Sequence, residues 1–174
     1  MRWTARFSLP PDQQSFTCVI GVGSPFGDDR IGWEVAAALE QVLHSGPASR
    51  VGVRTCILDR PGAALLDALR GVRHAVIVDA AHGTDSAPDT LQWLEQHAIG
   101  TMPSASSHGF GLAEALALGR ALGALPPRVD VLAVSGGRFE GETLSEAVMR
   151  AAPAAVRAIE ARLLDAVGDE PREG

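Results

Sequence analysis

Cysteine is scarce in this sequence, which contains only Cys18 and Cys56 among its 174 residues. Both cysteines lie inside apolar runs that are typical of strands, so we interpret them as buried thiols. Two such residues make neither a zinc ribbon nor a disulfide framework. The chain must therefore be stabilised by a hydrophobic core and not by covalent or metal crosslinks.

The sequence also lacks a long apolar run and an excess of basic residues. No run approaches the roughly 20 apolar residues that span a bilayer. Residues 1–10 lack the uninterrupted apolar region of a signal peptide. The formal net charge of −6 argues against a nucleic acid or an anionic membrane as partner. We therefore expect a cytoplasmic protein that binds neither nucleic acid nor membrane.

The composition is that of an ordinary globular domain. Apolar residues make up 46% of the chain and charged residues 21%, and 174 residues suit one domain with its own core. Residues 1–15 contain Pro10-Pro11 and show no periodicity, so we expect them to form a loose N-terminal extension. A single α/β domain is expected over 16–167, followed by a flexible tail at 168–174.

Strand-like and helix-like segments alternate along this domain. Four segments predict strands: 16–23, 51–58, 75–78 and 129–134. The first, third and last of them are interpreted as strands buried on both faces. Residues 90–95 partly alternate, which predicts an edge strand with one solvated face. This order predicts a three-layer α/β/α sandwich, similar to phosphorylase and hydrolase folds, around a mostly parallel five-stranded sheet with an antiparallel edge strand. We expect the first, third and last strands to be central.

The first helix follows the first strand after a glycine-rich bend. We interpret Asp28 as its N-cap, because aspartate is a preferred capping residue. The apolar residues that share the predicted inward face are Ile31, Val35, Leu39 and Val42.

Two later helices are expected before and after the last strand. The inward face of the earlier one is predicted to hold Leu112, Leu116 and Leu122. Thr143 and Glu146 have the spacing of a capping box at the start of the final helix. Pro153 lies inside that helical pattern and should kink or split it.

The bend at 21–32 allows two interpretations. A glycine-rich turn after a first strand often binds phosphate, but Phe26 occupies the position of the third glycine of a dinucleotide fingerprint. Asp28 and Asp29 would repel a pyrophosphate at the helix N-terminus, and the chain contains no Gly-Lys-Ser or Gly-Lys-Thr. A site that uses the carboxylates to bind a metal is the other interpretation.

Three polar residues stand where the chain passes from one element to the next. Asp29 follows the first strand, Asp79 ends the third, and His108 opens the helix after a long loop. In the predicted fold these residues converge on the carboxyl edge of the sheet, where ligands bind. Two carboxylates and an imidazole suit a borderline divalent ion such as nickel or zinc, with positions left for substrate or water.

Each of these residues also has a structural explanation. Asp29 could complement the helix dipole, Asp79 could accept backbone hydrogen bonds in its turn, and His108 could cap its helix. His82, three residues after Asp79, is a rival ligand. Spacing alone does not decide between these explanations and a metal site.

At these positions the sequence resembles a known family, the hydrogenase maturation proteases. These endopeptidases trim the carboxyl terminus of the large subunit of nickel–iron hydrogenases. Four motifs carry the resemblance in order: Gly21-Val-Gly-Ser-Pro-Phe-Gly-Asp-Asp-Arg-Ile-Gly32, Val76-Ile-Val-Asp-Ala80, Ser107-His-Gly-Phe-Gly-Leu112 and Leu144-Ser-Glu-Ala-Val148. The resemblance extends from about Val19 to Leu163.

The resemblance implies a metal-dependent endopeptidase whose partner is a hydrogenase large-subunit precursor. Asp29, Asp79 and His108 would be both the catalytic and the metal-contacting residues. The metal would be nickel already loaded in the substrate, and zinc or another divalent ion could bind in vitro.

The turns around this site depart from the family pattern. Ser24 replaces the usual asparagine, the link to Asp28 is one residue shorter, and two further turns differ at 59–62 and 135–138. These departures motivate a second hypothesis, a non-catalytic chaperone or scaffold that recognises the metal-loaded partner. A nucleotide-using α/β enzyme is the third.

Overall fold

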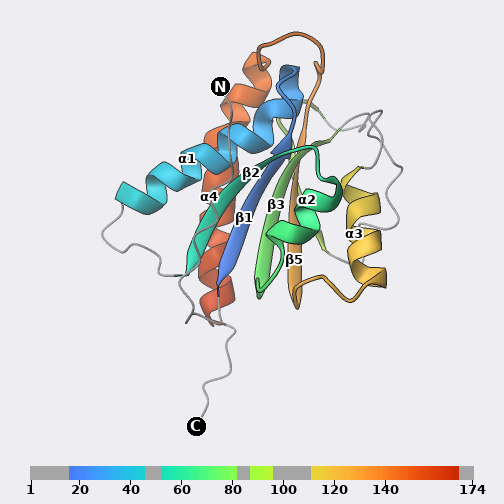
Figure 1. Ribbon diagram of the computed structural model, residues 1–174. Coiled ribbons are helices and arrows are strands. Elements are labelled where there is room, and N and C mark those ends of the chain that lie inside the picture. The colour runs from blue at the N-terminus through green and yellow to red at the C-terminus, as the bar shows by residue number, and fades with distance from the viewer. Residues whose placement is uncertain (1–15, 46–51, 82–86, 96–110, 169–174) are drawn as a thin grey trace.

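The computed structural model describes residues 16–45, 52–81, 87–95 and 111–168 (Figure 1). The helices and strands, in chain order, are β1 (Thr17–Gly23), the 3-10 turn η1 (Gly27–Arg30), α1 (Ile31–Ser45), β2 (Val53–Asp59), α2 (Gly62–Ala68), β3 (His74–Ala81), β4 (Leu91–Glu95), α3 (Leu112–Ala121), β5 (Arg128–Ser135) and α4 (Glu146–Gly168). The predicted extension at 1–15, the loop at 96–107 and residues 169–174 of the predicted tail at 168–174 lie outside the described residues. Gly168, predicted as part of that tail, is the last residue of α4.

The five strands form one sheet in the order β2-β1-β3-β5-β4. Strands β2, β1, β3 and β5 are parallel, and β4 pairs antiparallel with β5 at the edge. The central strands are buried along most of their length, as expected for strands covered on both faces. The predictions of three central strands and an antiparallel edge strand are confirmed.

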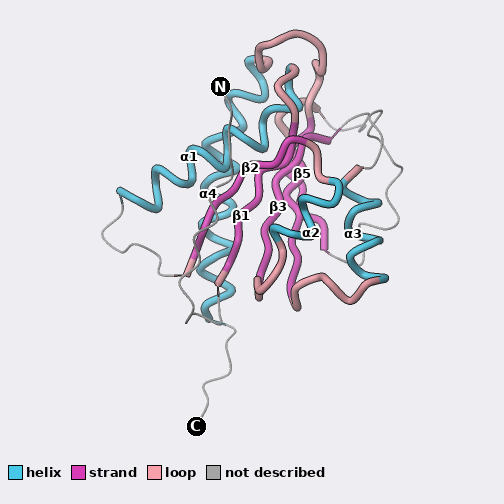
Figure 2. The backbone as a smooth tube through the Cα atoms, viewed as in Figure 1, coloured by secondary structure: helices cyan, strands magenta, loops and turns pink. Residues whose placement is uncertain are grey.

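Helices cover both faces of the sheet (Figures 1 and 2). On one face, α1 and α4 bury Val35, Leu39, Val148 and Ile159 against β1, β3 and β5. On the other face, α2 and α3 pack Leu65 and other apolar residues against the same strands. This arrangement confirms the predicted three-layer α/β/α sandwich. None of the helices in the described ranges has both the length and the apolarity needed to cross a membrane.

Two residues predicted to face inward are exposed. Val42 is 41% exposed and Leu122 is 65% exposed. Val42 lies in the last turn of α1, and Leu122 follows the last residue of α3. The helical spacing of apolar residues continues to both positions, but no other element in the described part of the chain covers these side chains.

The start and middle of α4 also differ from prediction. Ser145 caps the helix, since its hydroxyl accepts a hydrogen bond from the Val148 amide at 3.4 Å. Thr143 instead accepts a hydrogen bond from Arg138, so the predicted capping box is wrong. The helix is continuous through Pro153, so it is not split there, and the kink stays a prediction. Pro153 is exposed, so the carbonyl that loses its helical partner can be hydrated.

A buried polar cluster holds the opposite, amino-terminal edge of the sheet. Asp130 of β5 accepts a hydrogen bond from His74 of β3 at 2.9 Å and another from Arg128 at 3.0 Å. Arg162 of α4 lies 3.9 Å from the same carboxylate and stacks over Trp93. This cluster ties α4 and three strands together, far along the strands from the candidate site.

Candidate metal-binding site at the carboxyl edge of the sheet

Asp29 and Asp79 lie at the carboxyl edge of the two central strands β1 and β3. Asp29 belongs to η1, which follows β1 after a three-residue link. Asp79 is near the end of β3, and its carboxylate accepts a hydrogen bond from the Ala80 amide at 2.9 Å. Neither side chain is fully buried. The structure therefore brings together two of the three residues that the sequence predicts for the site.

Two glycines make this approach possible. A Cβ atom on Gly32 would collide with the carbonyl oxygens of Val22 and Val78, and one on Gly23 would collide with the carbonyl oxygen of Asp29. The first turn of α1 can therefore lie directly on the ends of β1 and β3. This close contact sets Asp29 beside Asp79.

The charge of Asp29 acts on Asp79. Removal from water and the negative charge of Asp29 raise the pKa of Asp79 to about 7, and the hydrogen bond from the Ala80 amide only partly opposes them. Near neutral pH the Asp79 carboxyl group is therefore partly protonated. A cation placed between the two carboxylates would replace that proton and relieve their repulsion.

Asp28, in contrast, has a structural role that differs from the predicted one. It does not cap the helix that follows: η1 has no side-chain cap, and the Asp28 side chain is fully buried. Its carboxylate accepts hydrogen bonds from the amides of Gly137, Arg138 and Ser145 at 2.9, 2.8 and 2.6 Å. The Ser145 hydroxyl donates a further one at 3.0 Å.

These hydrogen bonds dominate the protonation of Asp28. Burial alone would raise its pKa, but the hydrogen bonds from Ser145, Arg138 and Gly137 outweigh burial and hold the pKa below its usual value. Asp28 is therefore an ionised residue that connects η1 with the loop between β5 and α4. It also fixes the backbone that carries Asp29.

Arg60 adds a positive charge to the same edge. Its amide donates to the Gly23 carbonyl at 2.9 Å, and its guanidinium pairs with Asp59 at 2.9 Å. Its pKa is raised by the hydrogen bond and charge of Asp59, with a smaller contribution from Asp29. The turn at 59–62 was expected only to depart from the family pattern, and the effect of Asp29 on Arg60 was not predicted. Asp59, the carboxylate at the end of β2, was the feature of the sequence that could have indicated an ion pair with Arg60 at this edge.

Arg60 adopts a left-handed backbone conformation with φ of 57°. Such a conformation costs a non-glycine residue roughly 1 kcal/mol. We expect Arg60→Gly to raise the free energy of unfolding by about 0.5–1 kcal/mol, because glycine adopts this backbone conformation without strain. The surface ion pair that the substitution removes contributes little. Urea unfolding of the two proteins checks this expectation, with Arg70→Gly as a control. Arg70 has a similar exposed ion pair with Asp67 but no positive φ. A destabilised Arg60→Gly protein would contradict it.

The third predicted ligand, His108, lies outside the described residues, as does its rival His82. Within the described ranges, no group of three or more His, Cys, Asp or Glu residues is arranged to hold a metal ion. The structure thus supplies two adjacent carboxylates that could serve as metal ligands, and the predicted imidazole is not among the residues that it describes.

Comparisons with known proteins agree with this fold. A family model described as hydrogenase maturation protease matches residues 59–162, a range that includes Asp79 and His108. No curated protein gives a significant match to the sequence.

Solved structures of hydrogenase maturation proteases are similar to this fold. The hydrogenase-maturating endopeptidase HybD from E. coli has 24% sequence identity and a TM-score of 0.72, over 87% of this chain and 93% of that one. The maturation protease HybD from Thermococcus kodakarensis has 20% identity and a TM-score of 0.67, over 83% and 97%. HycI from the same organism has 17% identity and a TM-score of 0.61, over 83% and 89%. These likenesses show a shared fold. Because the family model matches more than half of the sequence, the chain belongs to the hydrogenase maturation protease family.

Proposed function

We propose that this protein is an endopeptidase that removes the C-terminal peptide of a nickel–iron hydrogenase large-subunit precursor after nickel insertion. The nickel carried by the precursor would be recognised by Asp29, Asp79 and His108. The observation that supports this proposal is the pairing of Asp29 with Asp79, whose pKa is raised to about 7 by burial and by the charge of Asp29. Two like charges held this close favour a cation between them.

The ligand types fit the proposed ion. Carboxylate and imidazole groups bind borderline divalent ions such as nickel, and a set of three leaves positions open for ligands from the substrate. Zinc or another divalent ion could bind the same groups in purified protein. Because the ion arrives with the precursor, binding it would fix the adjoining polypeptide at the carboxyl edge of the sheet. Placing the scissile bond in this way lowers the entropic cost of the reaction.

The proposal is tested by the mass of the precursor after incubation with the protein. We expect the nickel-loaded precursor to lose a C-terminal peptide, which mass spectrometry resolves directly. Stable binding of the nickel-loaded precursor with no change in its mass would contradict the proposal, and would instead favour a chaperone or scaffold.

A further inference from the structure

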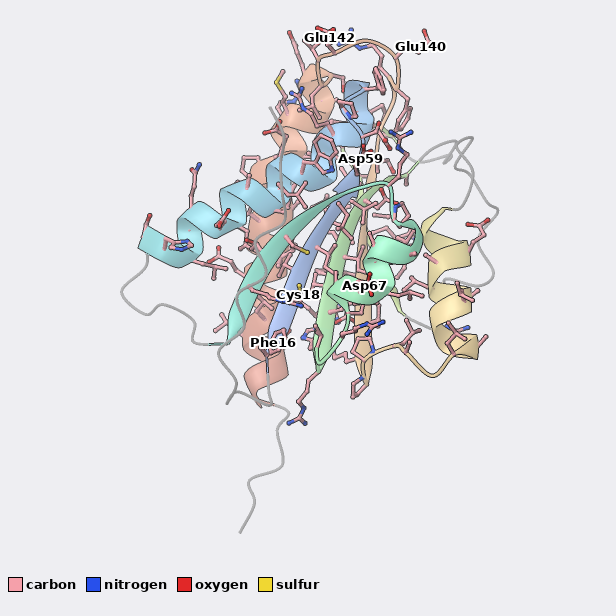
Figure 3. The ribbon with its side chains drawn as sticks, viewed as in Figure 1. Phe16, Cys18, Asp59, Asp67, Glu140 and Glu142 are labelled. Atoms are coloured by element: carbon pink, nitrogen blue, oxygen red, sulfur yellow. The ribbon has the colours of Figure 1, made fainter. Side chains whose placement is uncertain are left out.

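A loop beside the candidate site has no role in the metal chemistry proposed above. Residues 136–145 connect β5 to α4 and project beyond the carboxyl edge of the sheet (Figures 1 and 2). We call this segment the β5–α4 arm. Glu140 and Glu142 lie at its tip, as Figure 3 shows. Both are exposed.

The arm is held in place by hydrogen bonds from η1 along its length. The Gly27 amide donates to the Gly141 carbonyl at 2.8 Å, and the Asp28 amide donates to the Arg138 carbonyl at 2.7 Å. Arg30 donates to the Glu142 carbonyl at 3.0 Å. Together with the hydrogen bonds that the Asp28 carboxylate accepts, these contacts order the arm before any partner binds. A preordered surface loses little conformational entropy on association.

The positive and negative side chains of the arm differ in their contacts. The Arg138 guanidinium donates to the Thr143 carbonyl and hydroxyl at 3.2 and 3.1 Å, so it is occupied within the arm. Within the described ranges, the carboxylates of Glu140 and Glu142 have no ion pair. The tip of the arm therefore presents net negative charge to solvent.

Two large exposed apolar residues belong to the segments that contact or follow the arm. Phe26, which is 53% exposed, precedes Gly27 and stands three residues before Asp29. Met149, which is 51% exposed, lies in the first turns of α4, four residues after Ser145. Aromatic residues and methionine are enriched in the cores of protein interfaces. Protein interfaces commonly combine apolar anchor residues with a charged rim. The two exposed apolar residues and the acidic tip of the arm offer the same combination.

We propose that Phe26, Met149, Glu140 and Glu142 form a docking surface for a basic segment of the precursor that carries apolar anchor residues. This inference rests on the proposed function. The apolar pair would supply most of the affinity, and the glutamates would attract and orient the segment. A segment bound there would lie next to Asp29. A second copy of this chain fits less well, because a symmetric contact would bury the acidic tips of both arms in one interface without adding a basic partner for them.

The test compares two double variants with matched controls, using the nickel-loaded large-subunit precursor from the same organism. Phe26→Ala/Met149→Ala removes the apolar pair, and its control, Leu122→Ala/Leu164→Ala, removes two leucines that are 65% and 61% exposed away from the arm. Glu140→Lys/Glu142→Lys reverses the acidic tip. Its control, Glu40→Lys/Asp165→Lys, makes the same change of charge on exposed residues of α1 and α4.

We expect both arm variants to raise the KM for the precursor about tenfold with little change in kcat, and both controls to match the wild type. The KM of the wild type should rise with salt, and that of Glu140→Lys/Glu142→Lys should not. Thermal unfolding should be similar for all five proteins, because the replaced side chains are exposed.

The outcomes separate this inference from the proposed function. Cleavage by the wild type with unchanged KM in the arm variants would overturn the docking surface alone. A wild type that binds the precursor without cutting it would overturn the proposed function. Calorimetry would then test the docking surface: weaker binding by the arm variants than by the controls would support it, and equal binding would overturn it. No binding by the wild type would overturn both. Self-association in sedimentation that is lost in Phe26→Ala/Met149→Ala would assign the surface to a second copy and contradict the inference.

Discussion

Replacing Asp79 by asparagine is expected to lower the rate of C-terminal processing at least about 100-fold. The amide that replaces the carboxylate is a poor ligand for nickel and leaves Asp29 without its acidic neighbour. The measurement is the initial rate of peptide release from nickel-loaded precursor, followed by mass spectrometry. Retention of wild-type activity would show that Asp79 does not contact the ion.

The same substitution should stabilise the metal-free protein at alkaline pH. The pKa of Asp79 is about 7 in the folded protein, above its ordinary value of 3.8, because the charged form is disfavoured by burial and by Asp29. Stability from this group is present below pH 4 and is lost as pH rises through about 7. We therefore expect Asp79→Asn to exceed the wild type in urea unfolding at pH 8 and to match it at pH 4. An inactive but more stable protein would separate a functional role from a structural one.

Asp28→Ala, unlike Asp79→Asn, should destabilise the protein and lower its free energy of unfolding by about 3 kcal/mol. The substitution leaves the buried amides of Gly137, Arg138 and Ser145 without their acceptor, and each loss of a charged hydrogen bond is costly. Urea unfolding at pH 7 measures the effect. Asp29→Ala is the matched control, since Asp29 accepts none of these hydrogen bonds. A decrease of less than about 0.5 kcal/mol for Asp28→Ala would contradict the account.

The contribution of Asp28 should also depend on pH. Its pKa is depressed in the folded protein by the hydrogen bonds from Ser145, Arg138 and Gly137, which outweigh burial. The stability that it provides is therefore present above the unfolded pKa of roughly 4 and is lost as pH falls through the lower folded pKa. The difference in stability between the wild type and Asp28→Asn should shrink as pH falls below 4. A difference that stays constant down to pH 2 would contradict this assignment.

The fold was predictable because its signals are local. Continuous apolar runs such as Val76–Val78 mark strands covered on both faces, and the alternation around Trp93 marks an edge. Asp29 and Asp79 were predictable as neighbours because the carboxyl ends of parallel strands meet at one edge. His108 was predicted by the same reasoning, but the described residues do not test it.

The role of Asp28 was not predictable, because its hydrogen-bond partners are more than 100 residues away in the sequence. Local spacing favours an N-cap at that position, and only the packing of η1 against the β5–α4 arm overrides it. The left-handed conformation of Arg60 is a second example: its amide donates to the Gly23 carbonyl of the neighbouring strand β1. Both residues depend on tertiary contacts that periodicity does not encode.

We propose that Asp29 and Asp79, with His108, recognise the nickel carried by a hydrogenase precursor. The most direct test of this proposal is to incubate the wild-type protein with nickel-loaded and nickel-free forms of the same precursor and to measure the released C-terminal peptide. The account predicts release from the nickel-loaded form alone. Equal release from both forms would contradict it.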